Sequence, residues 1–212
     1  MCQICNALTR TFNDRRYGIT YEVCDECDFI FKQKQFQVDK EAELEQYDMH
    51  DNSFESLGYV AMFERLIKDH IRPLKITGKA LEFGSGPGPV LKELLSREKG
   101  LEVYDFDPFY KNDPSYKKHQ YDLITTTEVA EHFFSPMKEF KHLASLLKVG
   151  GYLVVMTSFR TMDEEKFLNW WYQRDITHVS FYNMKTMKYI AEIIGLKIES
   201  YNDKNVVIFT KT

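Results

Sequence analysis

The sequence contains no long hydrophobic run, since no apolar stretch approaches the roughly 20 residues that a membrane-spanning helix requires. Its first residues are cysteines and polar residues, which lack the apolar core of a secretory signal peptide. These two absences argue against a membrane protein and against a secreted protein. We therefore expect a cytoplasmic protein that has no membrane partner.

The sequence also has no excess of basic residues. It contains 28 Lys and Arg and 32 Asp and Glu, which gives a formal net charge of −4. This balance disfavours a bulk nucleic-acid binder without excluding nucleic acid as a partner. With 43% hydrophobic and 28% charged residues, the 212-residue chain has a globular composition. Its length fits one domain plus a small appendage, and composition leaves the oligomeric state open.

Cysteine is scarce, and its positions form a pattern. The only four cysteines make two C-x2-C pairs: Cys2, Cys5, Cys24 and Cys27. Each pair places two thiolates on one side of a metal, and the two pairs complete the tetrahedron of a structural zinc ion with no open catalytic position. The alternative is that the four cysteines form two disulfides, but disulfides are rare in cytoplasmic proteins. We expect a zinc-ribbon-like module over residues 1–36, with a strand over residues 17–23.

Three glycines at alternate positions mark the centre of the chain. Gly84, Gly86 and Gly88 follow an apolar run, residues 80–83, that predicts a strand, and residues 90–96 predict a helix. A strand, a glycine turn and a helix form the first unit of a nucleotide-binding α/β sheet. Glycine permits unusual backbone angles there and lets the backbone approach a ligand.

A second predicted strand, residues 101–106, ends in Asp107 and Pro108. Nucleotide-binding sheets place a carboxylate at this position on the hydroxyls of the ribose. Asp105 competes for the role, because strand alternation puts it on the same face, but Asp107 stands at the end of the strand. Residues 108–120 are short and irregular, so the third strand and its helix look abbreviated.

These stretches resemble class I S-adenosylmethionine (SAM) dependent methyltransferases. The run Glu82-x-Gly84-x-Gly86-x-Gly88 resembles motif I of that family, and residues 121–132, YDLITTTEVAEH, resemble motif IV. The run LLKVGGYLVV is similar to the turn before strand five, with Val149 in place of the proline. The resemblance covers residues 57–212. It implies an α/β, Rossmann-like fold with one mainly parallel, seven-stranded sheet, helices on both faces and a closing antiparallel hairpin.

The resemblance also implies a cofactor site. Its expected members come from the motifs and from the linker and pre-sheet segment, residues 37–56: Glu82, Phe83, Gly84, Ser85, Gly86, Gly88, Asp107, Pro108, Thr127, Glu128, Tyr47 and His50. Asn52 and Glu55 predict the N-terminal cap of a helix over residues 53–71. Glu131 and His132 either belong to the site or only position their loop.

An aromatic stretch after the fifth predicted strand is the candidate acceptor site. Trp170, Trp171 and Tyr172 could wall a substrate pocket. Asp175 and His178 stand three residues apart, so one turn could bring carboxylate and imidazole together and orient the histidine as a general base. The alternative is that His178 is a buried structural histidine and that Asp175 only accepts its hydrogen bond.

We therefore expect a SAM-dependent methyltransferase that yields S-adenosylhomocysteine and carries a structural zinc. The aromatic stretch and the acidic net charge favour a small-molecule acceptor. Two alternatives remain open at this point. One is an RNA or protein methyltransferase that uses the zinc module for docking. The other is a SAM-binding protein without catalysis.

Overall fold

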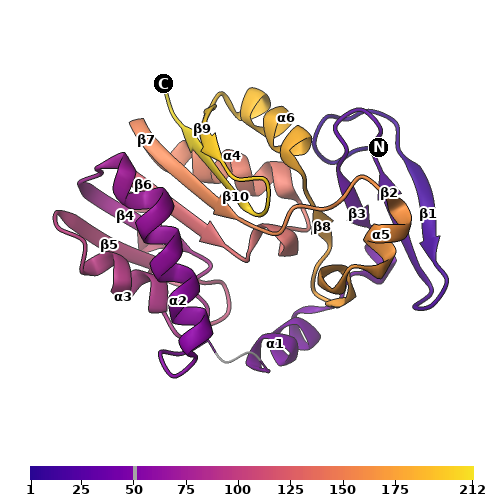
Figure 1. Ribbon diagram of the computed structural model, residues 1–212, viewed down its shortest axis with the longest axis horizontal. Helices are drawn as coiled ribbons and strands as arrows, with labels where there is room; N and C mark the ends of the chain where they lie inside the picture. The colour runs from indigo at the N-terminus through magenta and orange to yellow at the C-terminus, as the bar shows by residue number, and fades with distance from the viewer. Residues whose placement is uncertain (50–51) are drawn as a thin grey trace.

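The computed structural model describes residues 1–49 and 52–212, which form a large mixed sheet covered by helices and a small sheet beside it (Figure 1). The large sheet has the order β5-β4-β6-β7-β10-β9. Its strands are β4 (Gly78–Phe83), β5 (Leu101–Phe106), β6 (Tyr121–Thr127), β7 (Leu147–Met156), β9 (Lys197–Tyr201) and β10 (Val206–Thr210).

The four strands β5, β4, β6 and β7 run parallel, and β10 pairs antiparallel with both β7 and β9. The closing hairpin and the mainly parallel order confirm the expected Rossmann-like fold. The carboxyl ends of β4, β5 and β6 share one edge of the sheet, where open α/β sheets bind ligands.

The sheet has six strands among the described residues, whereas the resemblance implies seven. Between β5 and β6 the chain forms a bridge from Asp107 to Lys111 and then a 3₁₀ turn, Pro114–Lys118, which Asp113 caps. Pro114 stands in the first turn of that helix, and proline cannot donate to a strand ladder. The abbreviated segment therefore has no room for a strand and a crossover helix.

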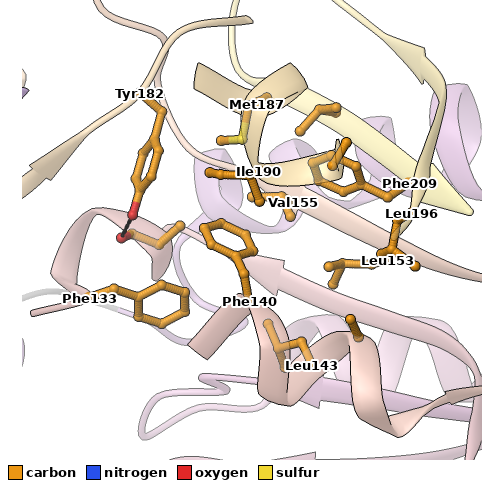
Figure 2. Close-up of a cluster of buried hydrophobic side chains, with 14 of the residues drawn as sticks. Phe133, Phe140, Leu143, Leu153, Val155, Tyr182, Met187, Ile190, Leu196 and Phe209 are labelled. Carbon is orange, nitrogen blue, oxygen red and sulfur yellow. Dashed lines mark hydrogen bonds between the residues drawn. The ribbon is translucent and has the colours of Figure 1, made fainter. Parts of the chain in front are cut away.

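Helices cover both faces of the sheet, as expected. The helices of the large sheet are α2 (Leu57–Leu66), α3 (Val90–Ser96), α4 (Pro136–Leu146) and α6 (Met184–Ile194). The α2 and α3 helices pack on one face through a cluster that includes Phe63, Leu91 and Val154. Helices α4 and α6 lie on the other face, where Figure 2 shows Phe140 and Ile190 meeting Val155 and Phe209 of the sheet.

The expected helix over residues 53–71 begins later. Helix α2 starts at Leu57, its cap residue Ser56 makes no side-chain cap bond, and the helix continues as a π turn, Ile67–Ile71. Asn52 is therefore not the helix cap, and that prediction is wrong. The reason is tertiary, because residues 52 and 53 lie against Gly88 instead.

The small sheet has the order β1-β2-β3-β8 and is antiparallel throughout. Its strands are β1 (Arg10–Asp14), β2 (Ile19–Val23), β3 (Ile30–Lys32) and β8 (Ser180–Phe181). Helix α5 (Glu164–Asn169) lies beside this sheet (Figure 1), and α1 (Lys40–Asp48) follows β3 in the chain. The last strand comes from the C-terminal part of the chain. One cluster of buried side chains includes both Cys24 and Phe140, so the cysteine module and the large sheet share a core.

Candidate active site

The glycine turn after β4 has the strained geometry that motif I requires. Gly84 and Gly86 adopt φ angles of 84° and 64°, in the left-handed region that favours glycine. A Cβ on Gly84 would lie 2.3 Å from Cγ2 of Val129. The turn therefore packs directly on the loop that follows β6, so motif I and motif IV meet in space.

The acid of motif I is buried beneath this turn. Glu82 is 3% exposed, and its Oε2 accepts a hydrogen bond of 2.8 Å from the backbone N–H of Lys92 in α3. Burial raises the pKa of Glu82 to about 8. Glu82 therefore holds the start of the helix against the turn.

Two features of the turn leave room for a polar ligand. The Oγ of Ser85 is buried and has no hydrogen-bond partner among the described residues. A Cβ on Gly88 would lie 2.0 Å from the carbonyl oxygen of Asn52, so the pre-sheet segment crosses over the turn. An orphaned hydroxyl inside a covered glycine turn fits the polar end of a cofactor.

The two acids at the end of β5 have different partners. Asp105 bonds Nζ of Lys92 at 2.8 Å and Nζ of Lys111 at 2.6 Å, and these lysines lower its pKa against the opposing effect of burial. Asp107 is 7% exposed and accepts a bond of 2.9 Å from the N–H of Gly86. Asp105 is thus neutralised by lysines, whereas Asp107 lies on the glycine turn itself.

Other expected cofactor residues take different positions. The ring of Phe83 points into the core and packs on Phe106, with ring centroids 5.2 Å apart, so only its backbone faces the turn. Pro108 is exposed, and Thr127 is buried at the end of β6. Glu128 follows with a φ of 52°, and its Oε2 accepts from the hydroxyl of Tyr172 at 3.1 Å.

The pre-sheet segment brings an aromatic ring to the same edge. Tyr47 of α1 makes edge-to-face contacts with Phe109, at 5.4 Å, and with His132, at 5.1 Å. Its ring therefore joins the region after Asp107 to the loop after β6. His50, the other expected residue of this segment, lies outside the described residues.

A buried polar cluster fills the loop after β6. Glu131 is fully buried, and its Oε2 accepts from the hydroxyl of Thr157 at 2.8 Å. That hydroxyl also lies 3.2 Å from the hydroxyl of Tyr172. The ring of His132 packs edge-to-face on the ring of His178, with centroids 4.8 Å apart. The sequence offered no sign that Thr157 would take part.

Burial shifts the titration of this cluster. It raises the pKa of Glu131 to about 7, with Glu128 adding a like charge, and it lowers the pKa of His132 to about 4. His132 is therefore neutral at physiological pH. A neutral imidazole beside a buried carboxyl group can bind a metal or accept a proton.

The proposed base and its acid lie close but are not hydrogen-bonded to each other. The Nε2 of His178 stands 3.9 Å from Oδ2 of Asp175, while its Nδ1 lies 2.7 Å from the carbonyl oxygen of Tyr172. Asp175 accepts from the N–H and hydroxyl of Thr177 instead. Three aromatic residues are expected to wall a substrate pocket. Tyr172 is buried, Trp170 stacks on it with ring centroids 4.8 Å apart, and Trp171 is 68% exposed.

A lysine that the sequence analysis missed holds this loop. Lys32 of β3 is 1% exposed, and its Nζ donates to the carbonyl oxygens of Asp175 at 2.8 Å and Ile176 at 3.3 Å. Burial lowers its pKa to about 8. Lysine is rarely buried, and a charged linker gave no signal that this one would be.

The four cysteines meet at one point, and none forms a disulfide. The Sγ atoms of Cys2 and Cys27 lie 3.4 Å apart, those of Cys5 and Cys24 lie 3.5 Å apart, and all four gather within 4.8 Å. A zinc ion with bonds of about 2.3 Å needs thiolates about 3.8 Å apart, so the spacing fits. Both C-x2-C pairs are followed by a left-handed residue, Asn6 or Asp28.

The fold, the glycine turn and the acid after the second strand are those of a SAM-dependent methyltransferase domain. A sequence family described as a methyltransferase domain matches residues 59–201, and the chain belongs to this family. None of the curated proteins matches significantly. No helix in the described part of the chain is long and apolar enough to cross a membrane.

Solved structures support the same fold at low identity. A protein described as an S-adenosyl-L-methionine-dependent methyltransferase from Methanococcus maripaludis is 16% identical, with a TM-score of 0.57 over 85% of this chain and 95% of that one. CalO1, a methyltransferase of calicheamicin biosynthesis solved with S-adenosylhomocysteine, is 13% identical, with a TM-score of 0.57 over 82% and 59%. The mitomycin 7-O-methyltransferase MmcR is 12% identical, with a TM-score of 0.50 over 74% and 59%. The chain thus spans about three fifths of the last two proteins.

Proposed function

We propose that this enzyme transfers the methyl group of SAM to a small-molecule acceptor. The observation that carries the proposal is the contact between the glycine turn and the loop after β6, at Gly84 and Val129. Val129 stands two residues before Glu131 on the same loop, which supports a position for the buried cluster of Glu131, His132 and His178 near the cofactor turn. CalO1 and MmcR, whose names refer to small natural products, share the fold and support this choice of acceptor.

The residues of the proposed site have two tasks: some would hold SAM, and others would accept a proton from the acceptor. The backbone of the glycine turn, the hydroxyl of Ser85 and the carboxylate of Asp107 would hold SAM, and Tyr47 and His50 of the pre-sheet segment are further candidates for this site. When bound, SAM supplies an activated methyl group on a sulfonium, so the protein mainly has to align the acceptor. His178, beside Asp175, would take the proton that the acceptor loses. The four cysteines would hold a structural zinc.

Two measurements test this function on the full-length protein. Calorimetry should show binding of S-adenosylhomocysteine, and labelled SAM with a metabolite extract should give a labelled small molecule. Binding without any turnover would favour the non-catalytic alternative, and label in RNA or protein would favour a macromolecular acceptor. Binding of NADH in place of S-adenosylhomocysteine would overturn the cofactor assignment.

The Asp107→Ala substitution should weaken S-adenosylhomocysteine binding by about 1.5–3 kcal/mol, or roughly 10–150-fold, because it removes a charged hydrogen-bond acceptor for the ribose. The control is Asp105→Asn, two residues earlier near the end of β5, since its carboxylate bonds Lys92 and Lys111. That variant should lose thermal stability and keep its affinity for the ligand. Equal affinity losses in the two variants would remove Asp107 from the ribose site.

A further inference from the structure

Three side chains with metal-binding atoms converge in the buried cluster from two separate loops. Glu131 and His132 follow β6, and His178 precedes β8. One ligand atom from each lies within 4.8 Å of the other two, and both Glu131 and His178 are buried. We propose that Glu131, His132 and His178 form a binding site for a divalent first-row transition-metal ion, separate from the four-cysteine site.

The hydrogen bonds of His132 and His178 fix the imidazole tautomer, the one with its proton on Nδ1, that a metal bound at Nε2 requires. The Nδ1 of His132 lies 3.1 Å from the carbonyl oxygen of Thr177, and the Nδ1 of His178 lies 2.7 Å from that of Tyr172. A carbonyl oxygen only accepts, so each Nδ1 carries a proton and donates. On each ring, Nε2 is then the nitrogen whose lone pair can bind a metal. Histidines that ligate metals are commonly held in this way, by a carbonyl group on the second nitrogen.

Glu131 supplies the second, independent sign of a ligand. Its Oε2 accepts from Thr157, but its Oε1 is buried and has no hydrogen-bond partner among the residues that the structure describes. A buried carboxylate oxygen without a donor is costly, and a cation would satisfy it. Glu128 and Asp175 lie close enough to act on Glu131 and His132 electrostatically, which adds negative charge around the site.

The donor set points to the class of metal. Two imidazoles and one carboxylate suit zinc, cobalt, nickel or iron rather than calcium or magnesium, which prefer oxygen ligands. Bonds of about 2.1 Å at tetrahedral angles need donor atoms about 3.4 Å apart, so the side chains must close slightly on the ion. Three protein ligands leave at least one coordination position for water or another ligand.

Metal binding has a consequence that rests on the proposed function. The Nε2 of His178 has one lone pair, which it gives either to a metal ion or to the proton of the acceptor. The two roles therefore exclude each other. Occupation of the site by a metal ion inhibits methyl transfer and leaves the glycine turn and Asp107 free to bind the cofactor.

Cobalt(II) is the probe, because its visible spectrum separates thiolate ligands from nitrogen and oxygen ligands. Full-length protein, washed with a chelator and carrying zinc in the four-cysteine site, is titrated with cobalt(II) by calorimetry and absorption. We expect one cobalt(II) per chain with no thiolate charge-transfer band. Glu131→Gln and His132→Asn should each weaken binding at least about tenfold. His142→Asn, on α4 outside the cluster, should bind as the wild type does.

Turnover in the same titration tests the consequence. Activity should fall with the half-saturation of cobalt(II) binding, while the affinity for S-adenosylhomocysteine stays unchanged and shows that the variants are folded. No binding beyond the four-cysteine site, or equal binding by all variants, would overturn the metal site. A rise in activity on saturation would overturn the inhibition. If the zinc-carrying protein without cobalt(II) neither binds S-adenosylhomocysteine nor turns over, the proposed function fails while the metal measurement still stands.

Discussion

The His178→Ala substitution should lower methyl transfer by about 10²–10⁴-fold, the usual contribution of a general base. The ring is buried among Tyr172, His132 and Asp175, and its Nδ1 donates a hydrogen bond to the carbonyl oxygen of Tyr172. Turnover is measured with labelled SAM on the acceptor from the extract screen. The affinity for S-adenosylhomocysteine should barely change, because the glycine turn and Asp107 are untouched.

The pH profile separates a base from a structural histidine. A base acts in its neutral form, so the wild-type rate should rise with pH as the catalytic histidine loses its proton and level off once it is neutral. The variant should lose this dependence. Asp175→Asn should shift the profile and cost less than the loss of the ring, since Asp175 stands 3.9 Å away and also bonds Thr177.

His142→Ala is the matched control, because this histidine lies on α4 and bonds the hydroxyl of Tyr116 outside the cluster. It should keep both the rate and the pH profile. Full turnover by His178→Ala on the true acceptor would make His178 a structural residue. His132, which is half-buried in the same cluster, would then be the next candidate.

The local parts of this fold could be predicted from the sequence because they depend on neighbouring residues. The expected helix over residues 90–96 begins and ends where predicted, since a charged stretch follows its apolar pattern. The C-x2-C pairs likewise form a cluster with the predicted spacing. Here the pattern and its cause lie within a few residues of the chain.

The features that were predicted wrongly or missed depend on contacts between residues far apart in the sequence. Asn52 does not cap α2, because its carbonyl oxygen lies over Gly88, more than thirty residues away. The burial of Lys32 comes from carbonyl oxygens of residues 175 and 176, and Glu131 meets Thr157 only when β6 and β7 pair. The strand β8 has two residues, and only its partner β3 defines it. No local pattern could have indicated these contacts.

The Cys24→Ser substitution should abolish zinc binding and most of the methyl transfer together. Structural zinc contributes about 10 kcal/mol or more to small modules of this kind, so its loss should unfold β1, β2 and β3. Zinc content is measured by elemental analysis of protein purified under reducing conditions. A wild-type protein without metal at these cysteines would sink the zinc assignment.

The effect on turnover follows from the way the small sheet is built. Strand β3 pairs with β8 through Ile30 and Phe181, and the N–H of Lys32 donates to the carbonyl oxygen of Val179 at 2.9 Å. The hydroxyl of Thr186 in α6 donates to the carbonyl oxygen of Cys27 at 2.8 Å. Loss of the zinc module therefore releases the segment that carries His178, while the glycine turn keeps its own contacts.

Lys32→Met tests this link without removing the metal, because the apolar side chain fits the buried path of the lysine stem. Its ammonium group is the donor to Asp175 and Ile176, and each lost bond from a charged donor costs about 1.5–3 kcal/mol. We expect zinc content and S-adenosylhomocysteine affinity near those of the wild type, with kcat at least about tenfold lower. Lys34→Met, an exposed lysine two residues further on, should leave all three quantities unchanged. If Cys24→Ser and Lys32→Met both keep full turnover, the module does not support the active site, and a separate docking role for it becomes the better explanation.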